Sequence, residues 1–191
     1  MKIFGIDPGS TRTGYGCVQV DGSRSRLVTF GAIATPAGAT FPHKLQVIHR
    51  ELRVLIAEHR PDCIAIEDVF HARNVRSALK LGHARGVALL AAMEAGVPIA
   101  EYSPAEIKQA VVGYGRAEKP QMQHMVQMLL GLTEAPTPHD AADALAVAIC
   151  HSHRASSIVA RIAAELPPVG SAQGTRAPRS WRQYRPAPGA R

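Results

Sequence analysis

The sequence predicts an α/β protein built on one mixed β-sheet with helices packed against it. Two short apolar runs, at residues 3–6 and 63–66, are typical of strands buried on both faces of a sheet. Two extended segments, at 14–20 and 27–35, are separated by an Asp-Gly-Ser turn and indicate an antiparallel meander. Segments with helical periodicity alternate with the remaining strands, which is the order expected of an α/β fold.

The first half of the chain contains the strands of the meander and two helices. The first strand ends at Asp7, and the Pro-Gly pair that follows it favours a tight turn. Pro42 marks the start of a helix that reaches about residue 60, where Pro61 ends it. The second apolar run ends at Glu67, and a helix is expected from about 75 to about 95.

The second half of the chain is expected to be mostly helical. A strand is predicted at 97–102, and Ser103 to Glu106 form a capping box that begins a helix ending near Gly113. A further helix is expected over 119–130, and the last one from Asp140 to about residue 166. Together these elements predict a mixed five-stranded sheet, an antiparallel meander plus parallel strands, flanked by helices.

The composition predicts one globular domain at residues 1–166 and a disordered basic tail at 167–191. Hydrophobic residues make up 46% of the 191 residues and aromatic residues 5%, so an aliphatic core is expected. Three cysteines without CxxC spacing are expected to be buried, reduced thiols. Because the sequence shows neither a transmembrane run nor a signal-peptide pattern, we expect a cytoplasmic protein with no membrane partner.

The positive charge of the chain is concentrated in the tail. The net charge is +7, and residues 167–191 hold five arginines and no acid, which leaves +2 on the first 166 residues. The tail is either a solubilising end or a loose contact with nucleic acid or protein. Binding of nucleic acid by the domain therefore requires local basic patches. The candidates lie on two segments and are Arg73, Arg76, Lys80 and Arg85 on one, and Lys108, Arg116 and Lys119 on the other.

Acidic residues follow both buried strands and begin the last helix. If the strands of Asp7 and Glu67 are neighbours, their carboxylates meet where open α/β sheets bind ligands. Asp140 and Asp143 are spaced i, i+3, so they share one face of the first helical turn. A structural role is also open to these acids. Asp7 can cap the Pro-Gly turn that follows it, and an acid in the first turn of a helix interacts favourably with the helix dipole. Capping of the last helix requires only one acid, however, and its first turn has two.

Together these four acids predict a site of hard oxygen ligands suited to Mg²⁺ or Mn²⁺. Two such ions, about 4 Å apart, would clamp the attacking and leaving oxygens of a phosphodiester. His139 precedes the helical acids, and it either ligates a metal, shuttles a proton or simply lies on the surface.

Four blocks of the chain, between about residues 1 and 155, form a recognisable series: GIDPGSTRTGYG, AIEDVFHARNVRSALKLGHARGVA, VVGYGRAEKPQMQHMV and HDAADALAVAICH. In order and spacing they resemble the signature blocks of the RuvC family of bacterial Holliday-junction endonucleases (crossover junction endodeoxyribonucleases). The resemblance implies a ribonuclease-H-like fold, a homodimer, Mg²⁺ and branch-migration partners of the RuvA–RuvB type. The residues on which the family's functional positions fall are the acids Asp7, Glu67, Asp140 and Asp143, the basic Lys108 and Lys119, and the junction-stacking Phe70. The tail has no part in it.

The leading hypothesis is a metal-dependent, structure-selective endonuclease that resolves four-way DNA junctions by paired symmetric nicks in recombination and repair. An actin-like ATPase or sugar kinase is one rival, because DPGSTRTG is similar to the phosphate loop of that superfamily. Such kinases require two copies of the fold core, and one copy nearly fills this chain. A small nuclease acting on RNA is a second rival, and a junction-binding protein without activity is a third.

Two further features each have two interpretations. The small residues Ala78, Gly82 and Gly86 recur every fourth residue, and this stripe forms either a dimer contact or a packing face within the monomer. Phe70 lies beyond the strand that ends at Glu67. Its ring either caps the core or stacks on a base that is unpaired at the junction.

Overall fold

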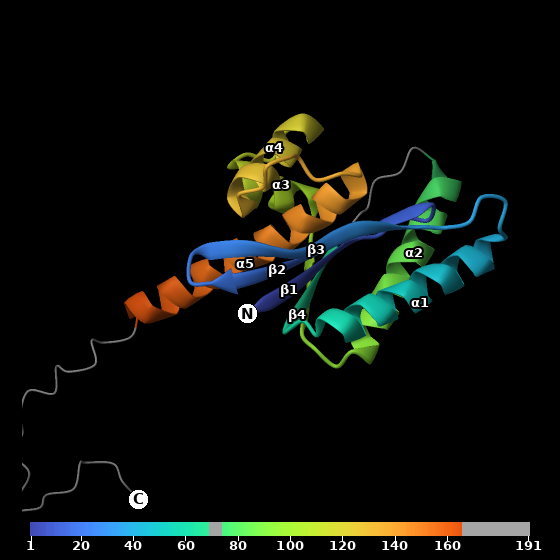
Figure 1. The fold of residues 1–191 in the computed structure, drawn as a ribbon, viewed down its shortest axis with the longest axis horizontal. Helices are drawn as coiled ribbons and strands as arrows, with labels where there is room; N and C mark the ends of the chain where they lie inside the picture. Colours follow the sequence, from blue (N-terminus) through green and yellow to red (C-terminus); the bar gives the residue numbers. More distant parts are fainter. Residues whose placement is uncertain (69–73, 166–191) are drawn as a thin grey trace, which may run out of the picture. The chain divides into compact units, whose positions relative to one another are not determined.

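The computed structural model describes residues 1–68 and 74–165, and within them a five-stranded sheet with helices on both faces (Figure 1). The strands are arranged in the order β3-β2-β1-β4-β5. β2 pairs antiparallel with both β1 and β3, and β4 pairs parallel with both β1 and β5. Their bounds are β1 (Lys2–Asp7), β2 (Arg12–Asp21), β3 (Arg24–Ala34), β4 (Cys63–Glu67) and β5 (Ile99–Tyr102). The helices are α1 (Phe41–His59), α2 (Val75–Glu94), α3 (Pro104–Val112), α4 (Lys119–Leu130) and α5 (His139–Glu165).

The mixed five-stranded sheet predicted from the sequence is confirmed, with small differences at the ends of elements. The last strand begins at Ile99 rather than at Val97. Pro98 has no N–H for the ladder, although its carbonyl accepts a hydrogen bond from the Ile64 N–H at 2.9 Å. Residues 1–157 form one compact unit, and the described part of the second unit continues α5 from Ile158 to Glu165. The predicted boundary at 166 and the predicted tail stay predictions, because residues 166–191 lie outside the described residues.

The central strand β1 is apolar because both of its faces are covered. Phe4 and Ile6 are fully buried in a cluster with α1 and α2, whereas Ile3 is fully buried in the cluster that contains α3, α4 and α5 (Figure 1). Alternate side chains of a strand point to opposite faces, so an uninterrupted apolar run is what a doubly covered strand requires.

Glycines in β1 and β2 allow α5 to lie directly on the sheet. Gly5 pairs with Gly16 across the two strands, and Gly14 pairs with Asp7. A Cβ at Gly14 would collide with the backbone carbonyl oxygen of Asp140, and a Cβ at Gly5 would collide with the carbonyl oxygen of Ala144. The backbone of α5 therefore approaches the strands as closely as van der Waals contact allows, and its first turn is fixed beside Asp7.

The expectation of buried, reduced thiols is confirmed. Cys17, Cys63 and Cys150 are all buried and free, and burial raises the pKa of each thiol to about 11. A thiol with a raised pKa is a poor nucleophile at neutral pH, so these side chains pack as small apolar groups. Among the residues that the structure describes, no helix has the length and apolarity needed to cross a membrane.

Candidate active site

The two acids that end buried strands lie next to each other in the structure. β1 and β4 are parallel neighbours, so Asp7 and Glu67 meet at the carboxyl edge of the sheet. The first turn of α5 adds Asp140 and Asp143 to the same place. All four carboxylates line one cavity of about 380 Å³. Its remaining lining residues come from the turn after β1, the start of β2 and the four helices α2, α3, α4 and α5, and they are Pro8, Gly9, Arg12, Leu81, Pro104, Ile107, Lys108, Lys119, Met122 and Ala146.

Burial and mutual repulsion raise the pKa values of these acids. Burial raises the pKa of Asp7 well above its usual range, and the charges of Glu67 and Asp143 raise it further. Burial also raises the pKa of Glu67, although a hydrogen bond with the Asp7 carboxyl opposes that shift. The pKa of Asp143 is raised by burial and lowered in part by the Lys119 ammonium. The cluster thus collects more negative charge than its surroundings stabilise, and protons or a cation must compensate it.

Three basic side chains lie beside the acids. The Lys119 Nζ is 3.8 Å from the Asp143 Oδ2, and Lys108 lines the same cavity and lowers the pKa of Glu67. The Arg12 Nη1 is 3.5 Å from the Asp140 Oδ2. Arg12 is not among the residues predicted from the sequence, and the signal that could have found it is its place at the start of β2, directly after the Pro-Gly turn that follows Asp7. A phosphate entering this cavity would meet these cations next to the carboxylates.

The donor set fits a divalent cation, because hard Mg²⁺ and Mn²⁺ prefer carboxylate oxygens. Among residues 1–68 and 74–165, no three acidic, histidine or cysteine side chains are grouped tightly enough to form a finished ligand set. The Asp7 and Glu67 carboxyls share a hydrogen bond, and all four acids line one cavity of about 380 Å³ in which a cation could be held. His139 is exposed and is not among the lining residues, but its charge lowers the pKa of Asp143, and its role as a metal ligand stays a prediction.

The other basic residues predicted to bind DNA lie outside the cavity lining. Arg76 and Lys80 are exposed on α2, where the Lys80 Nζ is 5.9 Å from the centre of the Phe41 ring. Arg116 is exposed in the segment between α3 and α4. Arg85 is not an unpaired cation, because it forms ion pairs with Asp68 and Glu101. Phe70 and Arg73 lie outside the described residues.

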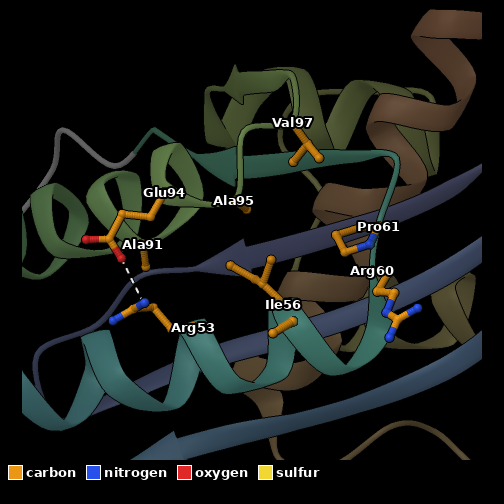
Figure 2. A pocket seen from close by; sticks show the side chains of 9 residues that line it. Arg53, Ile56, Arg60, Pro61, Ala91, Glu94, Ala95 and Val97 are labelled. Carbon is orange, nitrogen blue, oxygen red and sulfur yellow. Dashed lines mark ion pairs between the residues drawn. The ribbon is translucent and has the colours of Figure 1, made fainter.

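A second cavity, of about 360 Å³, lies between α1 and α2 (Figure 2). Its acidic side chain, Glu94, is already paired with Arg53, whose Nε is 2.8 Å from the Glu94 Oε2. Pro61 and Val97, which precede β4 and β5, also line it. This cavity therefore lies at the edge of the sheet opposite to Asp7 and Glu67, and it lacks the carboxylate cluster.

A mixed sheet of this order, with carboxylates and lysines gathered where β1 and β4 end, is the arrangement of the ribonuclease-H-like class, and the charged groups of the cavity suit chemistry on a phosphate ester. Comparison with known proteins narrows the class to one family. Residues 3–151 match the family model of the crossover junction endodeoxyribonuclease RuvC, and the chain belongs to this family. The identification suggested by the four sequence blocks is confirmed.

Individual relatives agree with this assignment. The crossover junction endodeoxyribonuclease RuvC of Syntrophomonas wolfei is 52% identical over 153 residues, which cover 80% of this chain and 89% of the relative. The solved structure of Thermus thermophilus RuvC in complex with a Holliday junction substrate is similar, with a TM-score of 0.78 and 39% identity, over 82% of this chain and 96% of that one. The yeast mitochondrial Holliday junction resolvase Ydc2, at 13% identity and a TM-score of 0.59, shares the fold over 85% of this chain and 84% of its own.

Proposed function

We propose that this crossover junction endodeoxyribonuclease resolves four-way DNA junctions by two symmetric nicks in strands of like polarity. The observation that carries the proposal is the single cavity lined by Asp7, Glu67, Asp140 and Asp143 beside two lysines. The Thermus thermophilus relative is solved with a Holliday junction, which supports the same substrate here. Water attacks the phosphorus in line, and the products carry a 5′-phosphate and a 3′-hydroxyl, as the family resemblance implies.

The four carboxylates are the proposed ligands of Mg²⁺, with Mn²⁺ as a substitute and two ions in each site. The cation would supply charge stabilisation for the phosphodiester and a more acidic water. Asp7, buried deepest among its acidic neighbours, and Glu67 are the groups whose charge most requires compensation. The raised pKa values support this proposal, because a cation can replace the proton that otherwise compensates the cluster.

Basic side chains are proposed to position the DNA backbone. Lys108 and Lys119 line the cavity and would bind the phosphates that flank the cut. Farther out, we propose phosphate contacts from Arg73, Arg76, Lys80 and Arg116, with Phe70 stacking on an unpaired base. Because phosphate contacts give affinity without sequence information, they account for binding and not for the choice of cleavage sequence.

A homodimer is proposed because two symmetric nicks require a two-fold arrangement of active sites. The exposed face of α2 supports it. Among the described residues, no atom lies within 4 Å of the place of a Cβ at Gly82 or at Gly86, which supports the dimer-contact interpretation over close packing within the monomer. Large apolar side chains are exposed on the same helix, including Leu79 at 60% and Met93 at 67%. An apolar surface of this kind on one helix is typical of an interface.

The rival functions fit less well. A kinase of the actin-like class has no use for the acids at the start of α5, and the chain belongs to a nuclease family. A junction-binding protein without activity would not need to retain four carboxylates in a place where their repulsion destabilises the metal-free fold. We also propose that branch-migration proteins of the RuvA–RuvB type assist the enzyme, as the family resemblance implies.

The proposal is tested with Asp7→Asn, which removes one charge from the cluster with little change in shape. We expect cleavage of a labelled four-way junction in Mg²⁺ to be lost, while junction binding, which depends on Lys and Arg, survives. Asp21→Asn is the matched control, because Asp21 is exposed at the end of β2 and away from the cavity. Cleavage by Asp7→Asn at the wild-type rate would show that the site is elsewhere.

A further inference from the structure

Arg85 connects the helix that carries the exposed apolar face to the strand that carries Glu67. It lies in α2 next to Ala84, which is fully buried in the cluster beneath the helix. The Arg85 Nη2 is 3.0 Å from the Asp68 Oδ1, and the guanidinium also pairs with Glu101 in β5. One cation is thus shared by two carboxylates, of which Asp68 directly follows β4 and Glu101 lies in the adjacent strand β5.

The contact between Arg85 and Asp68 differs from ordinary surface ion pairs in its burial. The side chains of Arg85 and Asp68 are 25% and 21% exposed. By contrast, the Arg50 and Glu51 side chains, which also pair, are 67% and 41% exposed. Removal of the Arg85 cation leaves the largely buried Asp68 carboxylate without its partner, which costs more than the loss of an exposed pair, whereas Glu101, at 41% exposure, keeps its contact with water.

Asp68 is held from two directions. Its backbone N–H donates to the Tyr102 carbonyl at 2.8 Å, which extends the pairing of β4 with β5 one residue past Glu67. Its side chain forms an ion pair with Arg85, although the Asp68 Oδ1 has no hydrogen-bond partner among the described residues. Since Glu67 precedes Asp68 directly, any movement of Asp68 changes the backbone that aims the Glu67 carboxylate.

The two acids point to opposite faces of the sheet. Ile66 packs in the cluster with α1 and α2, so Glu67, the next residue of the strand, faces the α5 side, where it lines the catalytic cavity. Asp68 returns to the α2 side, where Arg85 binds it. Arg85 does not line the cavity and acts on Glu67 through the backbone.

We infer that Arg85 is a positioning residue for the metal ligand Glu67, and that it acts by clamping Asp68 and Glu101 against α2. The inference rests on the proposed metal site. It also separates Arg85 from the basic residues that bind phosphate, because both of its nearest partners are carboxylates of this chain. Groups that support a ligand in this way typically change metal affinity or activity about 10- to 100-fold when they are removed.

The test measures Mn²⁺ affinity by calorimetry, junction affinity against salt, and the nicking rate for Arg85→Gln in the full chain. We expect Mn²⁺ affinity and nicking rate to fall about tenfold or more, with junction affinity and its salt dependence unchanged. Arg53→Gln is the matched control, because it breaks an ion pair with Glu94 of α2 at the far edge of the sheet and should change none of the three. Wild-type Mn²⁺ affinity in Arg85→Gln would overturn the inference.

Three further variants separate the remaining outcomes. Asp68→Asn removes the carboxylate charge from the same ion pair and should lower Mn²⁺ affinity and nicking rate as Arg85→Gln does. The double variant with both substitutions should lose no more than Arg85→Gln alone, because both substitutions break one contact. A salt slope that is shallower by about 1 would identify Arg85 as a phosphate contact and overturn the inference. The Mn²⁺ affinity of Glu67→Gln is measured alongside. A wild-type Mn²⁺ affinity in Glu67→Gln would contradict the proposed metal site itself. If Glu67→Gln loses Mn²⁺ affinity while Arg85→Gln keeps it, only the role of Arg85 is contradicted.

Discussion

Replacement of Gly14 with alanine should displace the catalytic carboxylates of α5 while the protein still folds. The new Cβ would collide with the backbone carbonyl oxygen of Asp140, and a backbone atom cannot rotate away as a side chain can. The first turn of α5 must therefore move off β2 by an amount on the order of 1 Å, and overpacking of this kind costs about 1–3 kcal/mol of stability. The carboxylates of Asp140 and Asp143 move with the helix.

The expected effect on activity is larger than the effect on stability. A displacement of about 1 Å in a catalytic group can lower the rate about 10²-fold. We expect Gly14→Ala to fold, to melt a few degrees lower and to bind a four-way junction normally, but to nick it about 10²-fold more slowly in Mg²⁺.

The measurements are a thermal melt, junction binding and single-turnover nicking. Gly115→Ala is the control, because the nearest atom to its Cβ would be at 3.6 Å, an ordinary contact. A Gly14→Ala protein that nicks at the wild-type rate would refute the claim that close approach of α5 to the sheet sets the position of the two helical acids.

Three other predictions address charge, assembly and the tail. The folded state raises the pKa of Asp7, so above the ordinary carboxyl pKa of about 4 the native protein binds more protons than the unfolded chain. The stability of the metal-free protein therefore falls as the pH rises from that value towards the raised pKa of Asp7. Asp7→Asn should therefore raise the melting temperature in chelator at neutral pH and reduce the further gain from Mg²⁺; a lower melting temperature would contradict the raised pKa. Gly82→Leu should weaken dimerisation in sedimentation at several concentrations, whereas an unchanged dimer would exclude that face of α2. Removal of residues 167–191, which carry +5, should lower affinity for any DNA and reduce the salt slope by up to about 0.9 for each arginine that contacts a phosphate. Loss of junction preference would show that the tail is specific.

Much of the fold was predictable because its signals are local. The apolar run of β1 is what a doubly covered strand requires, and the Ser103–Glu106 capping box is present as the sequence predicts. Asp7 and Glu67 could be brought together by one assumption, that their strands are neighbours, and β1 and β4 are paired.

The features that the sequence does not predict depend on contacts between residues far apart in the chain. Arg12 and Asp140 are 128 residues apart in the sequence, and no periodicity or spacing rule connects them. Arg85 was grouped with basic residues on its helix, because its pairing with Asp68 and Glu101 appears only when the strands are placed beside α2. The role of Gly14 was likewise hidden, since a glycine in a strand gives no indication of which helix will lie on it.

The central claim, that the carboxylate cavity cuts four-way junctions in symmetric pairs, is tested most directly by mapping nicks at nucleotide resolution. Each strand of a four-way junction is labelled in turn and incubated with the full chain in Mg²⁺ and in chelator. We predict two nicks at symmetric positions in strands of like polarity, with 5′-phosphate ends, in Mg²⁺ and none in chelator. Nicks that persist in chelator, or that fall in one strand without a symmetric counterpart, would contradict the account.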